Sequence, residues 1–333
     1  MGFLHKAKHM HDKSSYGVNM TCEFFNTIEH HQSYIFEHRM NINTAFYRIL
    51  VTLSLIFLSF NSHAASGDNT INWAGCGITK KAFMSELAAA YETKTGIHIN
   101  LQGGGATRGI RDTSAMKIDM GGSCRMALPE ADSSELHAIL HPVAWDALAI
   151  IVNKNNPVSN LSSKQIEKIY TGKLSNWSQV GGNNAPIHLY VRQGNISGVG
   201  YAIRQYLFAN GQQKFTTQAK YKVKSSGPLE RAVESDPQAM GITGVSSARK
   251  RNVKIIGFDG KTPTFENVKA GKYGLYRPLY LVTSPTPSKQ VKDFIKYATS
   301  KEGRTIIRNN GTVPYHEALH LMSKMRIYGF GVE

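Results

Sequence analysis

Residues 71–109 read INWAGCGITKKAFMSELAAAYETKTGIHINLQGGGATRG, and this stretch decides the fold class. Residues 71–75 predict a short strand that ends in glycine. Residues 81–94 place apolar side chains at a helical spacing. Residues 97–101 alternate as a strand does, and a glycine-rich turn over residues 103–109 leads into a short helix. Strand, helix and strand in succession predict an α/β fold with a mainly parallel sheet.

The same alternation continues along the rest of the chain. We expect further strands at residues 118–123, 143–152 and 187–191, and helices at residues 164–170, 201–208, 289–299 and 302–308. No internal repeat and no low-complexity linker interrupts the pattern. Two lobes, if present, would therefore be interwoven through short hinge strands and not joined by a flexible tether.

The N-terminal segment has the pattern of a secretory signal. Residues 49–58 form an apolar run that follows Arg48, and small residues stand at the two positions that a signal peptidase reads, ending at Ala64. The run is too short for a membrane-spanning helix, and the alternative is a buried helix or strand. A normal signal begins at Met40, so we interpret residues 40–64 as a signal peptide and residues 1–39 as an over-called start. Six histidines in residues 1–39 show no regular ligand spacing.

Cleavage after Ala64 would leave 269 residues with a net formal charge of +15. Such a balance favours an acidic partner: an anionic solute, a membrane surface or nucleic acid. Export argues against nucleic acid, and the basic residues are scattered, so the charge supports only a general attraction for anions. Two cysteines remain, Cys76 and Cys124. An even pair in an exported protein predicts a disulfide, with two buried free thiols as the alternative. No lipoprotein cysteine follows the apolar run, so we expect a soluble protein without a lipid anchor.

Three loops share a design suited to oxyanions. Residues 75–79, 103–109 and 195–200 each follow a predicted strand, are rich in glycine or hydroxyl residues, and lead toward a helix. A helix N-terminus offers free N–H groups and the positive end of its dipole, so it attracts anions. Arg192 precedes the third loop and offers a fork that fits phosphate-like groups. The three loops together predict an oxyanion cradle.

Other chemistries are less well supported by the residues. The nucleotide pattern Gly-x-x-x-x-Gly-Lys-Ser/Thr is absent. Cys76 with a histidine could form a nucleophile pair, but the disulfide is the favoured interpretation. No His, Cys and carboxylate cluster has metal-ligand spacing, so no metal and no cofactor are expected. His98 lies within a predicted strand and is interpreted as a surface or packed residue.

Several segments resemble one family, the phosphate-binding receptors of ABC importers, which are type 2 periplasmic binding proteins. The segments are Asn153–Pro157, Ile169–Gly182 (IYTGKLSNWSQVGG), Gly271–Tyr273 with Arg277–Tyr280, and Lys301–Pro314. The resemblance runs from about residue 71 to residue 316. It implies two α/β lobes, each a mainly parallel sheet flanked by helices, joined by two hinge strands with the ligand between the lobes.

On this resemblance, the first lobe comprises residues 66–145 plus 245–333 and the second residues 146–244. The chain would cross near Trp145-Asp146 and near Gly241–Gly244. The resemblance further implies a monomeric periplasmic protein, not an enzyme, that closes around phosphate or a similar oxyanion and docks on an ABC permease in the inner membrane. The alternatives are a sensor or envelope protein that binds an anion without transport and, less favoured, a hydrolase.

The family's binding loops map onto a defined set of positions. The expected ligand-binding residues are Gly77, Ile78, Thr79, Ala106, Thr107, Cys124, Arg125, Arg192, Ser197, Gly198 and Val199. Ile78 and Val199 stand where the family has hydroxyl residues. Cys124 stands where its best-known members have the aspartate that accepts the ligand's proton. The resemblance also places Cys76 near Cys124, so a disulfide there would rigidify the floor of the pocket.

Overall fold

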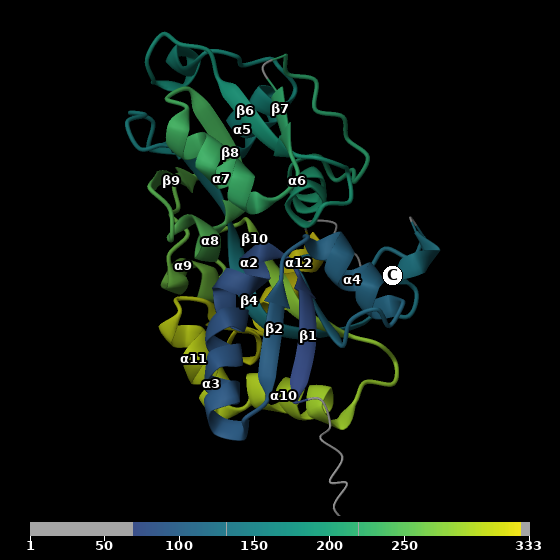
Figure 1. Ribbon diagram of the computed structural model, residues 1–333. Coiled ribbons are helices and arrows are strands. Elements are labelled where there is room, and N and C mark those ends of the chain that lie inside the picture. The colour runs from purple at the N-terminus through teal and green to yellow at the C-terminus, as the bar shows by residue number, and fades with distance from the viewer. Residues whose placement is uncertain (1–68, 131, 219, 328–333) are drawn as a thin grey trace, which may run out of the picture. The chain divides into compact units, whose positions relative to one another are not determined.

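The computed structural model describes residues 69–327 apart from residues 131 and 219. The predicted extension at residues 1–39 and the predicted signal peptide at residues 40–64 lie outside the described residues. Within the described part, strands and helices alternate from the first strand onward, as the sequence predicts (Figure 1).

The strands follow the order β2-β1-β3-β10-β4-β8-β6-β7 along one hydrogen-bonded path. Their bounds are β1 Thr70–Gly75, β2 His98–Gln102, β3 Met120–Ser123, β4 Ile139–Asn153, β5 Asn160–Leu161, β6 His188–Arg192, β7 Lys220–Val223, β8 Ala239–Gly244, β9 Val253–Phe258, β10 Tyr276–Thr283 and β11 Val313–Pro314. Strand β4 connects two parts of the path, because its first half pairs with β10 and its second half pairs with β8 and β9.

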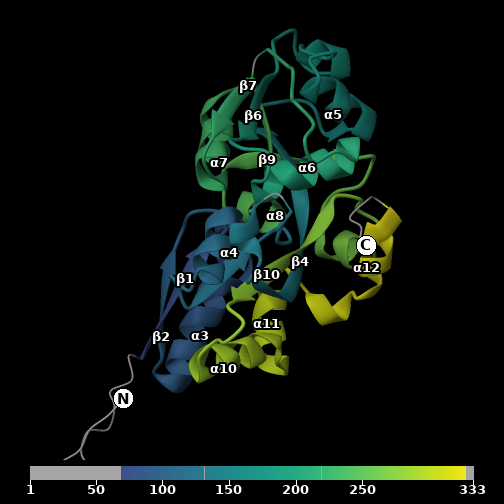
Figure 2. The same cartoon turned by 90° about the vertical axis from the view of Figure 1, so that its right-hand side faces the viewer.

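The helices are assigned to the two parts by their contacts. Their bounds are α2 Gly77–Thr79, α3 Ser85–Thr95, α4 Ala106–Ser114, α5 Ser163–Tyr170, α6 Gly198–Phe208, α7 Ser226–Ser235, α8 Val245–Ala248, α9 Phe265–Lys269, α10 Lys289–Thr299, α11 Lys301–Asn309 and α12 His320–Ile327. Helices α3 and α4 pack on β1, β2 and β3, whereas α6 and α7 pack on β6 and β8. Figure 2 shows α5, α6 and α7 around β6 and β7, with α10 and α11 beside α3.

Each of the two parts of the sheet has three parallel strands at its centre, and antiparallel strands connect the two parts. Strands β2, β1 and β3 run parallel, as do β7, β6 and β8. Strand β10 is antiparallel to both β3 and β4, and β4 is antiparallel to β8. The sheet is therefore mixed, and the prediction of mainly parallel sheets holds only for the three strands at each centre.

The element boundaries differ from expectation mainly at glycines. The first helical segment starts at Gly77, four residues before the predicted start, and continues through the π-helical turn Lys80–Met84. Helices α4 and α6 begin at Ala106 and Gly198, inside segments that were predicted to be loops. Strand β4 is longer than predicted because residues 139–142 pair with β10. In the three helical segments that start at Gly77, Ala106 and Gly198, residues of the predicted glycine-rich loop form the first turn.

Close backbone approach requires glycine where α4 lies against the sheet. A Cβ on Gly109 would lie 2.5 Å from the Gly122 carbonyl oxygen, and a Cβ on Gly121 would lie 2.2 Å from the Gly109 carbonyl oxygen. A side chain at either position would push the helix away from β3. The glycines thus hold the N-terminus of α4 close to the ends of β1 and β3.

Candidate functional site

The three predicted loops meet at one place in the structure. Gly105 donates its N–H to the Gly75 carbonyl, at 3.0 Å, which joins the first and second loops. The third loop approaches from the other part of the sheet. A Cβ on Gly198 would lie 2.3 Å from the Cys124 sulfur and 3.2 Å from the Ala106 side chain. The starts of the segments at Gly77, Ala106 and Gly198 therefore converge around Cys124.

Arg192 is the last residue of strand β6, and hydrogen bonds to neighbouring residues of the same part of the sheet hold its side chain. Its Nη1 donates to Ser226 Oγ and its Nη2 to the Lys224 carbonyl, both at 2.9 Å. Its Nε is buried without a hydrogen-bond partner among the described residues. Burial lowers the pKa of Arg192, and the nearby charge of Arg277 acts in the same direction. An anion bound beside Arg192 would supply the missing acceptor.

Ser197 precedes helix α6 and also lacks a partner. Its backbone is extended, and its side chain caps no N–H of the helix. Its Oγ is buried and makes no hydrogen bond within the part of the chain that the structure describes. A buried hydroxyl without a partner is uncommon. Ser197 and Arg192 are therefore two donors available to a ligand at the third loop.

Arg125 has a different environment from the one predicted. Its guanidinium donates to both carboxylate oxygens of Glu135 at 2.7 Å, and to the carbonyls of Met126 and Ile196 at 2.7 Å. Its Nη2 also donates to Thr107 Oγ1 at 3.2 Å. These contacts occupy the guanidinium with protein partners. Arg125 therefore links the second loop to the third loop, and its role as a ligand contact remains a prediction.

The remaining predicted residues are buried around the same point. Thr79 donates to the Ser123 carbonyl at 3.2 Å, and Ile78, Ala106 and Val199 belong to the apolar core. Their side chains cannot replace the hydroxyl donors of the family's pattern. Any contribution of Ile78 and Val199 to an anion must therefore come from backbone N–H groups at the helix starts.

The predicted disulfide between Cys76 and Cys124 is not formed in this structure. Both cysteines are free and buried, and their sulfurs lie 2.9 Å apart, whereas a disulfide requires about 2.05 Å. The predicted proximity of the pair is confirmed. The hydrogen bond shared with Cys124 lowers the pKa of Cys76 to about 6, while the pKa of Cys124 is raised by the same bond and by burial.

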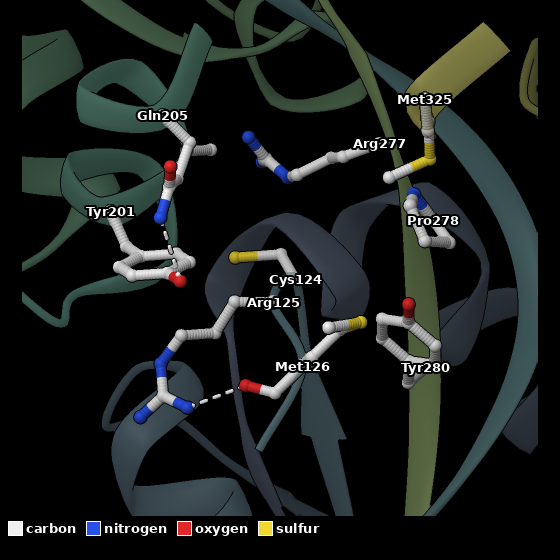
Figure 3. A pocket seen from close by; sticks show the side chains of 10 residues that line it. Cys124, Arg125, Met126, Tyr201, Gln205, Arg277, Pro278, Tyr280 and Met325 are labelled. Atoms are coloured by element: carbon white, nitrogen blue, oxygen red, sulfur yellow. Dashed lines mark hydrogen bonds between the residues drawn. The ribbon is translucent and has the colours of Figure 1, made fainter. Parts of the chain in front are cut away.

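Sequence reasoning missed a second buried arginine at this site. Arg277 lies in strand β10, opposite Asp146 of β4, and is 2% exposed. It lines a pocket beside Cys124 together with Gln205 and Tyr201 (Figure 3). The available signal was a charged residue within the otherwise uncharged strand Tyr276–Thr283.

Contacts between side chains hold the two parts of the sheet together near the loops. Lys81, beside the first loop, donates to Glu230 of helix α7 at 3.1 Å, and Arg251 donates to the same carboxylate at 3.1 Å. Glu230 is fully buried and also accepts from Thr243. The ion pair between Lys81 and Glu230 therefore ties the start of the first helical segment to helix α7 beside the site.

Two further features of the described residues bear on function. No helix among residues 69–327, with the gaps noted above, is long and apolar enough to cross a bilayer. Within the same residues, no group of three or more His, Cys, Asp or Glu side chains is placed to hold a metal ion.

The fold and the converging loops define a ligand-binding protein, and comparison with known families agrees. The model of a family described as the PBP superfamily domain matches residues 62–302. The chain belongs to this family, and its fold is the two-lobed α/β fold of type 2 periplasmic binding proteins.

Several relatives carry names that describe a ligand. The chain is 26% identical to the phosphate-binding protein PstS of Bacillus subtilis over 75% of this chain and 81% of that protein. It is 28% identical to PstS of Borreliella burgdorferi, where the match spans only 63% of the relative's length.

Two solved structures extend the comparison. A phosphate ABC transporter substrate-binding protein from Clostridium perfringens with bound phosphate is 27% identical, with a TM-score of 0.67 over 74% of this chain and 99% of that chain. An ABC-type phosphate transport receptor from Vibrio cholerae is 28% identical, with a TM-score of 0.57 over 73% of this chain and 99% of that chain.

Proposed function

We propose that this protein is an exported receptor that captures phosphate or a similar tetrahedral oxyanion and delivers it to an ABC permease. The observation that carries the proposal is the convergence of three helix starts on one point where Arg192 Nε and Ser197 Oγ are buried without partners. Helix N-termini and a guanidinium both favour an anion, and a partly enclosed site strengthens each hydrogen bond.

The names and titles of the relatives support both the ligand and the partner. The Bacillus and Clostridium proteins are described as phosphate-binding and as the substrate-binding component of an ABC transporter. A periplasmic location, the signal peptide at residues 40–64, a monomeric state and an inner-membrane permease are parts of the proposal that follow from this role. Binding by itself needs no catalytic residue, and none is assigned.

The mechanism of capture follows from the placement of the donors. Arg192 and Ser197 belong to the part of the sheet built on β6, whereas the helix starts at Gly77 and Ala106 belong to the part built on β1 and β2. An anion bound by both sets of donors stabilises the arrangement in which the loops touch. Ligand binding would thus favour the closed form that a permease recognises.

A ligand titration tests the proposed function directly. Isothermal calorimetry on purified residues 65–333, with phosphate, sulfate, arsenate and molybdate, should show one site per chain with a micromolar or lower Kd for at least one anion. Failure of all four anions to bind at micromolar concentrations would contradict the proposal.

The pKa of Cys76 makes a further prediction about pH. Above about pH 6 the Cys76 thiol ionises, and a thiolate beside the site repels an anion by on the order of 1–2 kcal/mol. Cys124 stays neutral because its pKa is raised. Relative to a Cys76→Ser variant, the wild-type protein should therefore bind phosphate equally at pH 5 and roughly tenfold more weakly at pH 8.

Comparing the wild type with Cys76→Ser at each pH cancels the effect that the ionisation of phosphate has on the Kd. Phosphate changes charge over the same pH range, but it does so equally for the wild type and the variant. The quantity to follow is the ratio of the two Kd values from pH 5 to pH 8. A ratio that stays constant over this range would show that no thiolate forms at Cys76.

A further inference from the structure

A small pocket lies next to the converging loops, between helix α6 and strand β10 (Figure 3). Its volume is about 70 Å³, which is room for on the order of five water molecules. Cys124 borders it, so the pocket shares a residue with the candidate oxyanion site. Its other side chains include Tyr201 and Gln205 from α6, and Arg277 and Tyr280 from β10.

One end of the pocket is strongly polar. Arg277 is 2% exposed, and none of its three guanidinium nitrogens has a hydrogen-bond partner among the described residues. The nearest carboxylate oxygen, on Asp146, is 3.9 Å from Nη2, and burial raises the pKa of Asp146, which weakens it as a counterion. A buried cation without hydrogen bonds destabilises the protein, because its lost hydration is not replaced. Figure 3 shows the guanidinium extending toward Gln205 and Cys124.

The opposite end of the pocket is apolar. Met126, Pro278 and Met325 line it, with the ring of Tyr280 beside them. Pro278, Tyr280 and Met325 are buried, and Met126 is partly exposed at 38%. A pocket with a guanidinium that makes no hydrogen bond at one end, and thioether and ring surfaces at the other, matches a small anion that carries an apolar substituent.

We propose that this pocket is a subsite for an organic oxyanion of the phosphonate class. Arg277 binds an anionic oxygen of the phosphonate group, and a substituent of one or two carbon atoms contacts Met126, Tyr280 and Met325. This inference rests on the proposed oxyanion-receptor function and names the substrate class of the same site. The five or six non-hydrogen atoms of methyl- or ethylphosphonate fit the volume of the pocket.

The position of Cys124 supports a link between the pocket and the cradle. Its sulfur contacts the first turn of α6 at Gly198, and the positive charges of both Arg192 and Arg277 act on its thiol. The two arginines therefore lie around the same residue from the two parts of the sheet. A ligand with an anionic group near Cys124 is attracted by both, and a substituent directed toward β10 enters the apolar end.

The experiment compares three ligands on three proteins. Calorimetry with phosphate, methylphosphonate and ethylphosphonate should show that the wild-type protein binds ethylphosphonate with a Kd within tenfold of that for phosphate. Arg277→Met should weaken both phosphonates at least tenfold. Ala202→Leu fills the pocket from α6, so it should raise the Kd ratio of ethylphosphonate to phosphate at least tenfold.

The controls separate the possible failures. Ala202→Val is a smaller change and keeps the size test valid if Ala202→Leu does not fold, as judged by the Tm without ligand. Methyl phosphate, an ester of similar size, distinguishes a phosphonate from a phosphate monoester as the bound form, and tighter binding of the ester would overturn the assignment. If the wild type binds phosphate but rejects ethylphosphonate by more than a hundredfold, the inference is wrong and the proposed function stands. If no tested anion binds, the proposed function itself fails.

Discussion

Replacing Arg192 with methionine should weaken oxyanion binding at least about thirtyfold. The guanidinium is already held by Ser226 and the Lys224 carbonyl, so its free Nε is oriented before a ligand arrives. Loss of a charge-assisted hydrogen bond to a bound anion costs about 2–5 kcal/mol. Arg192→Lys should recover only part of the affinity, because lysine lacks the planar fork that these contacts use.

The measurement is the Kd for the best ligand of the panel, with the Tm of each variant determined without ligand. Arg304→Met serves as a matched control, because Arg304 lies in helix α11 and donates to the Thr299 carbonyl, away from the loops. The control should bind as the wild type does. An Arg192→Met protein that folds and binds within threefold of the wild type would place the anion elsewhere.

Replacing Glu135 with glutamine should reduce the free energy of unfolding by about 3–5 kcal/mol, because Arg125 would remain buried without a counter-charge. The side chains of Arg125 and Glu135 are 1% and 0% exposed, and two hydrogen bonds of 2.7 Å join them. Urea unfolding at pH 7 measures this loss. Glu302→Gln removes the surface pair with Lys94, which is about half exposed, and should change stability little.

The contribution of Glu135 should also depend on pH. Burial raises the pKa of Glu135, but the hydrogen bonds and charge of Arg125 outweigh it and lower the pKa below the ordinary value of 4.5. A carboxylate whose pKa is lowered by folding stabilises the protein fully above its ordinary pKa and loses that contribution as the pH falls. The difference between wild type and Glu135→Gln should therefore be largest near pH 7 and shrink below pH 4.5.

The same variant should affect the ligand loops. Arg125 also holds the Ile196 carbonyl, one residue before Ser197, and contacts Thr107 in the second loop. Without Glu135 the guanidinium loses the carboxylate that fixes its position. Glu135→Gln should therefore weaken oxyanion binding several-fold, and unchanged affinity would show that the third loop is positioned without Arg125.

Much of the fold follows from local sequence patterns. The alternation in residues 71–109 predicted the first two strands and the helix between them, because burial of one face imposes a period on each element. The antiparallel pairing of β10 with β3 and β4 was not predictable, since it joins segments more than 120 residues apart. The register of such pairs depends on the packed sheet and leaves no local pattern.

The sequence predicted the three loops of the candidate site and Arg192. It did not predict which other arginines lie at the site or which of them pair with a carboxylate. Arg192 was identified because it ends a strand before a glycine-rich loop. Arg125 looked equally suitable, yet Glu135 lies on a short 3₁₀ turn that brings its carboxylate to the guanidinium. Arg277 reaches the site from β10, whose neighbours in the sheet come from distant segments. Which arginine is left without a hydrogen-bonded carboxylate depends on tertiary packing alone.

Strand β10 also has a consequence for the order in which the chain can fold. Residues 121–123 of β3 pair with residues 280–282, whereas β6, β7 and β8 lie within residues 188–244. The three parallel strands of the second part are thus complete before β10, which begins at Tyr276, can pair with the strands of the first part. Contacts so far apart in sequence slow folding. During synthesis from the N-terminus, β3 and β4 therefore cannot pair with β10 until most of the chain has been made.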